Sequence, residues 1–170
     1  MTDGRAMYEN ELIELSAAGV RFLVIGGVAV GMHGYPSATF DLDILPDLSS
    51  DNLGLLITAL GKLGYQPMAP VDPNELKDPD KRRVWYEEKN MKVFSFVKAD
   101  SPRDVVDVMI YHPIDFETCF ARRRTISIQG REVCVAAAED LLELKKAAGR
   151  DKDQVHIAAL ERFLKGRDRS

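Results

Sequence analysis

The stretch that decides the fold is Phe22-Leu-Val-Ile-Gly-Gly27 together with Asp41-Leu-Asp-Ile44, which follows after a spacer of thirteen residues. The first part is a short run of strand-forming residues that stops at two glycines, so it predicts a buried strand followed by a tight turn. The second part alternates acidic and apolar residues, which is typical of a strand. Side chains two residues apart in a strand share a face, with Cα atoms roughly 6.6–7 Å apart. We therefore expect Asp41 and Asp43 to point the same way.

Two carboxylates held this closely repel each other unless a cation lies between them. The repulsion amounts to about 2–3 kcal/mol at an effective dielectric constant of about 20, and to about 0.6 kcal/mol in bulk water, so partial burial favours a bound cation. A set of oxygen ligands favours Mg²⁺ or Mn²⁺ over Zn²⁺. Asp107 is the third candidate ligand, because it interrupts an otherwise apolar strand expected at residues 105–111, where an unpaired charge is costly.

The glycine pair, Gly26 and Gly27, offers a place for phosphate groups. Glycine lets the backbone turn tightly and approach a ligand, and the start of the following helix presents free N–H groups to an anion. Ser37 and Thr39, in the spacer before the acid pair, add two hydroxyl groups that can donate hydrogen bonds. The sequence thus places a candidate phosphate site beside a candidate metal site.

Ile25-Gly26-Gly27 and the acid pair with its apolar neighbours resemble the signature of the nucleotidyltransferase superfamily of the DNA polymerase beta type, with Asp107 as the third acid. Within this superfamily the chain is similar to small bacterial stand-alone members and to the AbiEii toxin group, which carry a late lysine-containing helix like residues 139–153. The resemblance extends from Phe22 to about Leu160. It implies an α/β (α+β) fold: a mixed β-sheet flanked by helices, with a helical C-terminal extension.

The resemblance also implies roles for the motif residues. Asp41 and Asp43 would hold two divalent ions, Mg²⁺ or Mn²⁺, and Asp107 would join the catalytic ion and help to deprotonate the attacking hydroxyl group. Two ions ~3.5–4 Å apart stabilise both the attacking and the leaving oxygen of an in-line displacement. Gly26 and Gly27 would cradle the phosphates of a nucleoside triphosphate.

The late helix supplies two further candidates. Lys145 would neutralise the phosphates, and Asp153 would serve as a functional acid of the late motif. Each has an alternative: most lysines are solvated, Lys146 competes directly with Lys145, and Asp153 suits a helix start where acids complement the helix dipole. The chain also has Ser37 where many relatives have an arginine, so one phosphate contact is missing or comes from another residue.

The reaction that this resemblance implies is transfer of a nucleoside monophosphate from a triphosphate to a hydroxyl acceptor, with release of pyrophosphate. The acceptor is RNA, a protein or a small molecule. Two other functions stay open. One is a catalytically degraded relative that binds nucleotide or a protein partner, as in a toxin–antitoxin pair. The other is an Mg²⁺-dependent phosphohydrolase that uses the same acids.

Composition limits the remaining possibilities. A chain of 170 residues with 45% hydrophobic and 29% charged residues has the length and balance of one globular domain. We expect its core at about residues 5–135 and its C-terminal helices at about residues 136–166. The net charge of −4 argues against attraction to nucleic acid over the whole surface. Because no signal-peptide pattern or long apolar stretch is present, the sequence predicts a cytoplasmic protein that does not enter a membrane.

Apolar spacing and turn residues predict the other elements. Helices are expected at residues 5–18, 28–33, 52–63, 114–123, 136–148 and 151–165. Strands are expected at residues 21–25, 41–45, 91–97 and 105–111, with a hairpin of residues 125–128 and 133–135. Residues 67–90 contain several prolines and a dense mixture of charges, which predicts a mobile or irregular insert whose large anchors are Trp85 and Tyr86.

Overall fold

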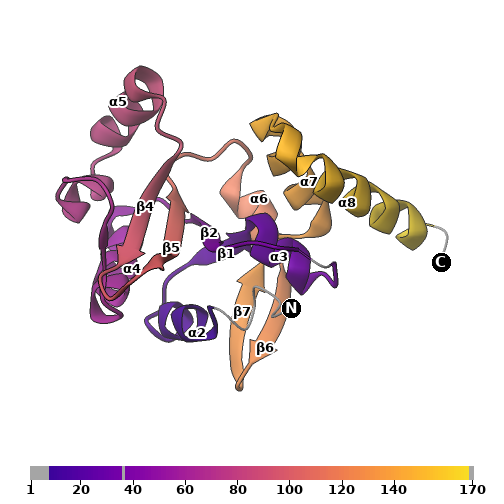
Figure 1. Ribbon diagram of the computed structural model, residues 1–170, viewed down its shortest axis with the longest axis horizontal. Coiled ribbons are helices and arrows are strands. Elements are labelled where there is room, and N and C mark those ends of the chain that lie inside the picture. The colour runs from indigo at the N-terminus through magenta and orange to yellow at the C-terminus, as the bar shows by residue number, and fades with distance from the viewer. Residues whose placement is uncertain (1–7, 36, 169–170) are drawn as a thin grey trace.

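A mixed seven-stranded β-sheet is the centre of the part of the chain that the computed structural model describes, residues 8–35 and 37–168 (Figure 1). Its strand order is β3-β4-β5-β2-β1-β7-β6. The strands are β1 (Phe22–Ile25), β2 (Asp41–Pro46), β3 (Tyr65–Pro67), β4 (Val93–Lys98), β5 (Ser101–Met109), β6 (Arg124–Ile128) and β7 (Arg131–Val135). The α-helices are α2 (Glu9–Ala17), α3 (Gly26–Met32), α4 (Ser50–Lys62), α5 (Pro79–Lys89), α6 (Phe116–Ala121), α7 (Ala138–Ala148) and α8 (Gln154–Arg167), and the 3₁₀ helices are η1 (Pro73–Lys77) and η2 (Asp151–Asp153).

The strands β1 and β2 lie in the middle of the sheet. All four residues of β1 are buried, and so are Leu42 and Ile44 of β2. β1 pairs antiparallel with β2 and parallel with β7, and β2 pairs parallel with β5. The expected strands at residues 21–25 and 41–45 and the expected mixed sheet are therefore confirmed, since apolar runs of this kind belong in the interior of a sheet.

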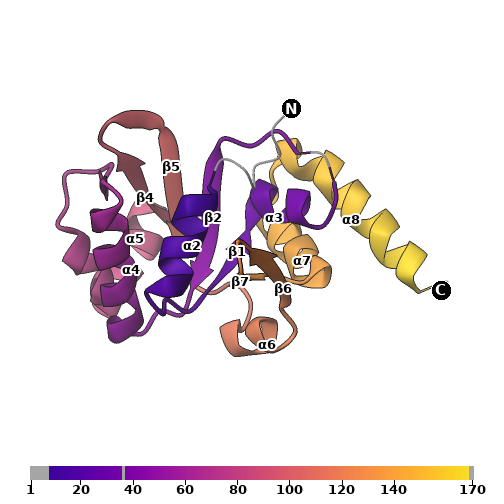
Figure 2. The ribbon, with the colours of Figure 1, turned by 90° about the horizontal axis from the view of Figure 1, so that it is seen from below.

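Figure 2 shows α4 and α5 on one side of the molecule, by β3 and β4, and α3, α7 and α8 on the other side. α3 packs against β1 and β2 in the middle of the sheet. α7 packs against both α8 and α3. The helical C-terminal extension is thus confirmed, and it contacts α3, which begins with the glycine pair. No helix within residues 8–35 and 37–168 is long and apolar enough to cross a membrane.

Local capping explains where α4 begins and ends. Ser49 Oγ accepts a hydrogen bond from the N–H of Asn52 at 3.3 Å, so the helix begins at Ser50 rather than two residues later. Gly64 follows the helix in a left-handed conformation, with φ of +88°. The expected helix at residues 52–63 is confirmed with this small change of its start.

The segment of residues 67–90 is not an irregular insert. It contains η1 and α5, because Pro73 and Pro79 each lie in the first turn of a helix, where a missing N–H costs nothing. Asp78 Oδ1 caps α5 by accepting a hydrogen bond from the N–H of Asp80 at 2.9 Å. The prediction was wrong because it took these prolines as breakers, whereas each follows an aspartate that starts a helix.

Two aromatic residues anchor this segment, as the sequence predicted. Trp85 is 7% exposed, and its ring lies 5.6 Å from the ring of Phe94 on β4. The ring of Tyr86 lies 4.3 Å from the ring of Tyr111, which follows β5. α5 is therefore packed on the β4–β5 part of the sheet.

Other boundaries differ from expectation by a few residues. α3 begins two residues earlier, at Gly26, and β5 begins four residues earlier, at Ser101. The short strand β3 was not expected. The first expected helix is observed as α2, and its predicted start at residues 5–7 lies outside the described residues.

Trp85→Ala is expected to lower the free energy of unfolding by about 3 kcal/mol, because it removes a large buried side chain and leaves a cavity. Urea denaturation followed by circular dichroism measures this change, and Lys89→Ala in the exposed last turn of α5 is the control. Trp85 is the single tryptophan of the chain, so native fluorescence reports its environment directly. An emission maximum typical of a solvent-exposed indole would contradict the packing of α5 on β4.

Candidate active site

The parallel pairing of β2 with β5 brings three carboxylates to one face of the sheet. In this register Asp41 lies opposite Val105, and Asp43 lies opposite Asp107. Residues directly opposite each other on paired strands share a face, and the apolar residues that alternate with the acids are buried on the other face. The structure thus places the three acids that the sequence predicted on neighbouring strands with a common orientation.

The surroundings of Asp43 disfavour its charged form. Burial is the largest cause, and the charges of Asp107 and Asp41 add to it, so the pKa of Asp43 rises to about 7. Burial also raises the pKa of Asp107, against a hydrogen bond from Ser95 that lowers it, and the charge of Asp41 raises it further. The three carboxyl groups are therefore within range of one another's charge. A cation placed among them would favour the ionised form of all three.

A serine of the neighbouring strand holds Asp107. The Ser95 hydroxyl donates a hydrogen bond to Asp107 Oδ1 at 2.5 Å, and Ser95 lies opposite Asp107 in the antiparallel pair of β4 and β5. Among the described residues Asp107 has no ion pair with an arginine or a lysine. Its carboxyl group is therefore oriented by a neutral donor and is not tied up in an ion pair.

The three acids fit a hard divalent cation in chemistry, although they do not form a closed cluster. In the part of the chain that the structure describes, no three His, Cys, Asp or Glu groups converge into a ready-made metal cage. The acids offer only oxygen atoms, which Mg²⁺ and Mn²⁺ prefer. Burial is the first cause that raises the pKa values of Asp43 and Asp107, although the charges of Arg150 and Lys145 lower that of Asp43 and the charge of Lys152 lowers that of Asp107. A bound cation would lower both pKa values further.

Gly26 allows the backbone to pass directly against Asp43. It has a φ of +68°, and a Cβ atom at this position would lie 2.3 Å from Asp43 Oδ2. Only glycine satisfies both the left-handed conformation and this close approach. The glycine turn and the second acid of the pair are thus packed against each other.

Gly27 packs against the two hydroxyl residues of the spacer. A Cβ atom there would lie 2.8 Å from Thr39 Cβ and 3.1 Å from Ser37 Oγ. The Ser37 hydroxyl lies 3.1 Å from Nε2 of His156 on α8, and Thr39 Oγ1 donates to the backbone oxygen of Asp41 at 3.3 Å. Both hydroxyls lie beside the glycine pair, as the sequence predicted, and both tie the spacer to neighbouring elements.

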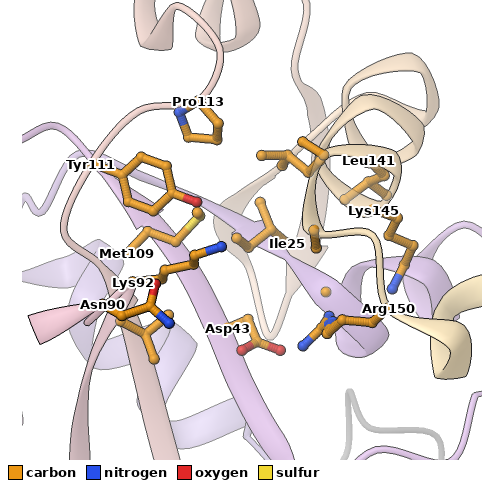
Figure 3. A pocket seen from close by; sticks show the side chains of 15 residues that line it. Ile25, Asp43, Asn90, Lys92, Met109, Tyr111, Pro113, Leu141, Lys145 and Arg150 are labelled. Carbon is orange, nitrogen blue, oxygen red and sulfur yellow. The ribbon is translucent and has the colours of Figure 1, made fainter. Parts of the chain in front are cut away.

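A cavity of about 490 Å³ opens beside Asp43 (Figure 3). Gly26, Lys145 and Arg150 line one end of it, together with Asp43. The rest of its wall comes from the end of β5, from the chain between α5 and β4, and from α7. The cavity therefore connects Asp43, Gly26 and Lys145 with a second region that the sequence did not reveal, whereas Asp41 and Asp107 do not line it.

Lys145 is buried at this end of the cavity, and it is paired with Asp153. Its Nζ lies 3.2 Å from Asp153 Oδ1, and the Nε of Arg150 donates to Asp153 Oδ2 at 2.7 Å. Although burial alone would raise the pKa of Asp153, the hydrogen bond from Arg150 and the charge of Lys145 lower it. Asp153 therefore stays ionised between two cations and does not line the cavity, whereas Lys145 and Arg150 do.

Several residues around this site have no signal in the sequence. Ser95 holds Asp107, and Lys92 and Tyr111 line the cavity. Strand register places Ser95, and the path of the chain around α5 and β5 places the other two, so no local pattern marks them. Arg150 was visible only as part of a charged run that also suits the start of a helix.

The arrangement of strands and helices is that of the nucleotidyltransferase fold. The lincosamide antibiotic adenylyltransferase LnuA, solved with bound lincomycin, is similar with a TM-score of 0.58 at 14% sequence identity, over 95% of this chain and 97% of that chain. ANT(2″)-Ia in complex with adenylyl-2″-tobramycin is similar with a TM-score of 0.59 at 13% identity, over 99% of this chain and 92% of that chain. A Thermotoga maritima protein assigned as a nucleotidyltransferase has a TM-score of 0.56 at 13% identity, over 95% of each chain.

These likenesses confirm the fold that the glycine and aspartate motifs predicted. No family model matches the chain, and no curated protein matches it in sequence. At such low identity the solved structures establish the fold and leave the roles of individual residues to be argued from this chain. The narrower resemblance to the AbiEii toxin group stays a prediction.

Gly26→Ala is expected to destabilise the protein by about 1–3 kcal/mol, because a Cβ atom forces a strained backbone and collides with Asp43. Gly31→Ala, in the same helix, has no atom within 4 Å of its new Cβ and is the matched control. Thermal unfolding measures both variants, and titration with Mn²⁺ measures cation affinity. Equal melting temperatures of the two variants would contradict the contact between the glycine turn and Asp43.

The pKa of Asp43 predicts how the stability of the metal-free protein depends on pH. The folded protein keeps this proton up to about pH 7, whereas the ordinary pKa is 3.8. The unfolded state therefore binds fewer protons in this window, and stability falls as the pH rises from about 4 to 7. As the pH rises across this window, the free energy of unfolding of Asp43→Asn is expected to increase relative to that of the wild type, by about 2–4 kcal/mol at pH 8.

Thermal unfolding in EDTA from pH 5 to 8 measures this difference, and Mn²⁺ is expected to raise the melting temperature of the wild type more than that of Asp43→Asn. A difference between the two proteins that is independent of pH would show that Asp43 is not desolvated.

Proposed function

We propose that this chain is a metal-dependent nucleotidyltransferase, which transfers a nucleoside monophosphate group from a nucleoside triphosphate to a hydroxyl acceptor and releases pyrophosphate. The observation that carries the proposal is the register of β2 and β5, which sets Asp43 beside Asp107 on the face that Gly26 also reaches. The likeness to solved adenylyltransferases over nearly the whole chain supports the same function.

In the proposed reaction the glycine turn and the cationic end of the cavity hold the triphosphate. The backbone of the turn at Gly26 and Gly27 lies against the phosphates, and this tight turn can form because both residues lack a Cβ atom. The ammonium group of Lys145 neutralises part of their charge. Asp153 keeps Lys145 in place, since its carboxylate lies between Lys145 and Arg150. Asp153 thus acts on the phosphates through its partner and makes no direct contact with them.

The acids act on the acceptor and on the phosphate that is transferred. Asp107, oriented by Ser95, receives the proton of the acceptor hydroxyl. The acceptor oxygen then bonds to the α-phosphorus while the bond from this phosphorus to the pyrophosphate oxygen breaks. Divalent ions held by Asp41, Asp43 and Asp107 would supply Lewis-acid stabilisation of both oxygens.

We infer further that the acceptor is a small molecule with a hydroxyl group. LnuA holds lincomycin, and ANT(2″)-Ia holds an adenylylated tobramycin. The net charge of −4 gives this chain no general attraction for RNA. RNA and protein acceptors are alternative outcomes of the assay below.

Incubation with each labelled nucleoside triphosphate, Mg²⁺ or Mn²⁺, and separate pools of hydroxyl-bearing small molecules, RNA and protein is expected to give transfer of label with release of pyrophosphate. Asp43→Asn and Asp107→Asn should each lower the rate about a hundredfold or more, since they remove charge at the reacting centre. Asp104→Asn is the matched control, because Asp104 lies on the same strand three residues before Asp107, and an odd spacing in a strand places it on the opposite face.

Two results would reject the proposed reaction. Release of inorganic phosphate that depends on Asp43 would assign the chain as a phosphohydrolase. Triphosphate binding without transfer to any acceptor class would favour the degraded, partner-binding relative. Transfer that survives Asp43→Asn would remove the site assignment itself.

A further inference from the structure

The cavity beside Asp43 is larger and more apolar than phosphate groups require. Its volume of about 490 Å³ lies in the range of pockets that enclose whole small molecules. Away from the charged end its wall contains Met109, Tyr111, Leu141 and Leu144. Figure 3 shows Tyr111 and Leu141 on opposite sides of this space. An apolar slot of this kind suits a flat ring system.

The apolar slot is continuous with the charged end of the cavity, so one ligand can occupy both. Gly26, Lys145 and Arg150 line the same cavity as Tyr111. Asp41 and Asp107 do not line it, although Asp43 does. The slot therefore adjoins Asp43 and leaves Asp41 and Asp107 outside the cavity.

Tyr111 is a fixed platform at the wall of the slot. Its ring packs on the ring of Tyr86 at 4.3 Å with an angle of 38° between the planes. Tyr86 comes from α5, so this helix supports one wall of the slot. Aromatic rings held in this way are common stacking surfaces for nucleobases.

Two polar side chains, Lys92 and Asn90, complete the slot. Both line the cavity, and Figure 3 shows the Lys92 ammonium group pointing into the space between Tyr111 and Asp43. Neither side chain has a hydrogen bond or an ion pair with another described residue. Asn90 ends α5 in a left-handed conformation, with φ of +50°. This turn brings the chain from the helix to the cavity wall.

We propose that this slot binds the base of the nucleotide and that Lys92 selects a base with a carbonyl group at purine C6 or pyrimidine C4, guanine or uracil, over adenine and cytosine, which carry an amino group there. The proposal rests on the proposed function for the presence of a nucleoside triphosphate. A lysine ammonium group only donates hydrogen bonds, and guanine offers it the adjacent acceptors O6 and N7. Adenine and cytosine carry an amino donor at the corresponding position, which opposes Lys92. Asn90 both donates and accepts, so it suits either keto base.

Affinity for the four α,β-methylene nucleoside triphosphates, measured by calorimetry with Mg²⁺, tests this assignment. The wild type is expected to bind the guanine and uracil analogues about tenfold more tightly than the adenine and cytosine analogues. Lys92→Met should bring this ratio close to one. Lys89→Met is the matched control, because Lys89 is exposed, lies three residues before Lys92 and does not line the cavity. It should leave the ratio unchanged.

Tyr111→Ala tests the stacking platform separately. It is expected to weaken all four analogues by about tenfold, because every base has a face that stacks. Tyr111→Phe should restore the affinity, since it keeps the ring. Thermal unfolding of each variant shows whether the fold is kept.

Three results would overturn the inference: a wild type that binds all four analogues equally or not at all, a Lys92→Met variant that weakens all four by the same factor, and a Tyr111→Ala variant with unchanged affinity. The second result would place Lys92 on the phosphates. Selective binding without nucleotide transfer would refute the proposed function and support the base site. Transfer with equal kcat/KM for all four triphosphates would support the proposed function and refute the base site.

Discussion

The parallel pairing of β2 with β5 is the constraint on which the site depends. It sets Asp43 opposite Asp107, residues that lie far apart in the sequence, and it turns both carboxylates to the face that Asp41 shares. A slip of one residue in this register would turn Asp107 to the apolar side of the sheet. The buried residues that alternate with the acids prevent such a slip, because it would expose them to water and bury the charges.

This arrangement places negative charge where solvent cannot stabilise it well. Burial and mutual repulsion raise the pKa of Asp43 to about 7 and raise that of Asp107. Gly26 lets the backbone come against Asp43, and Ser95 fixes the orientation of Asp107 without neutralising it. Burial and repulsion of this kind cost folding free energy, and a ligand that binds only the folded state and relieves them would stabilise the protein.

Elements distant in the sequence supply the positive charge and the apolar wall. α7 packs against α3 and carries Lys145 to the end of the cavity beside Gly26. Removing Lys145 and Asp153 from water is costly, and the bond from Arg150 to the same carboxylate offsets part of that cost. α5 supports the opposite wall through Tyr86. The cavity is therefore formed by segments that are distant in the sequence and meet only in the folded chain.

The sequence by itself determined the central strands, the glycine turn and the common face of Asp41 and Asp43, because these follow from local periodicity and from the conformations that glycine allows. It also predicted Asp107, since a charge within an apolar strand is costly without a partner. The prediction for residues 67–90 was wrong, because each of two prolines there follows an aspartate that caps a helix and lies in the first turn of that helix. Only the tertiary structure decided that Ser95 faces Asp107, that Lys145 is buried against Asp153, and that a cavity opens beside Asp43. These contacts join distant segments, and strand register and helix packing fix them rather than any local pattern.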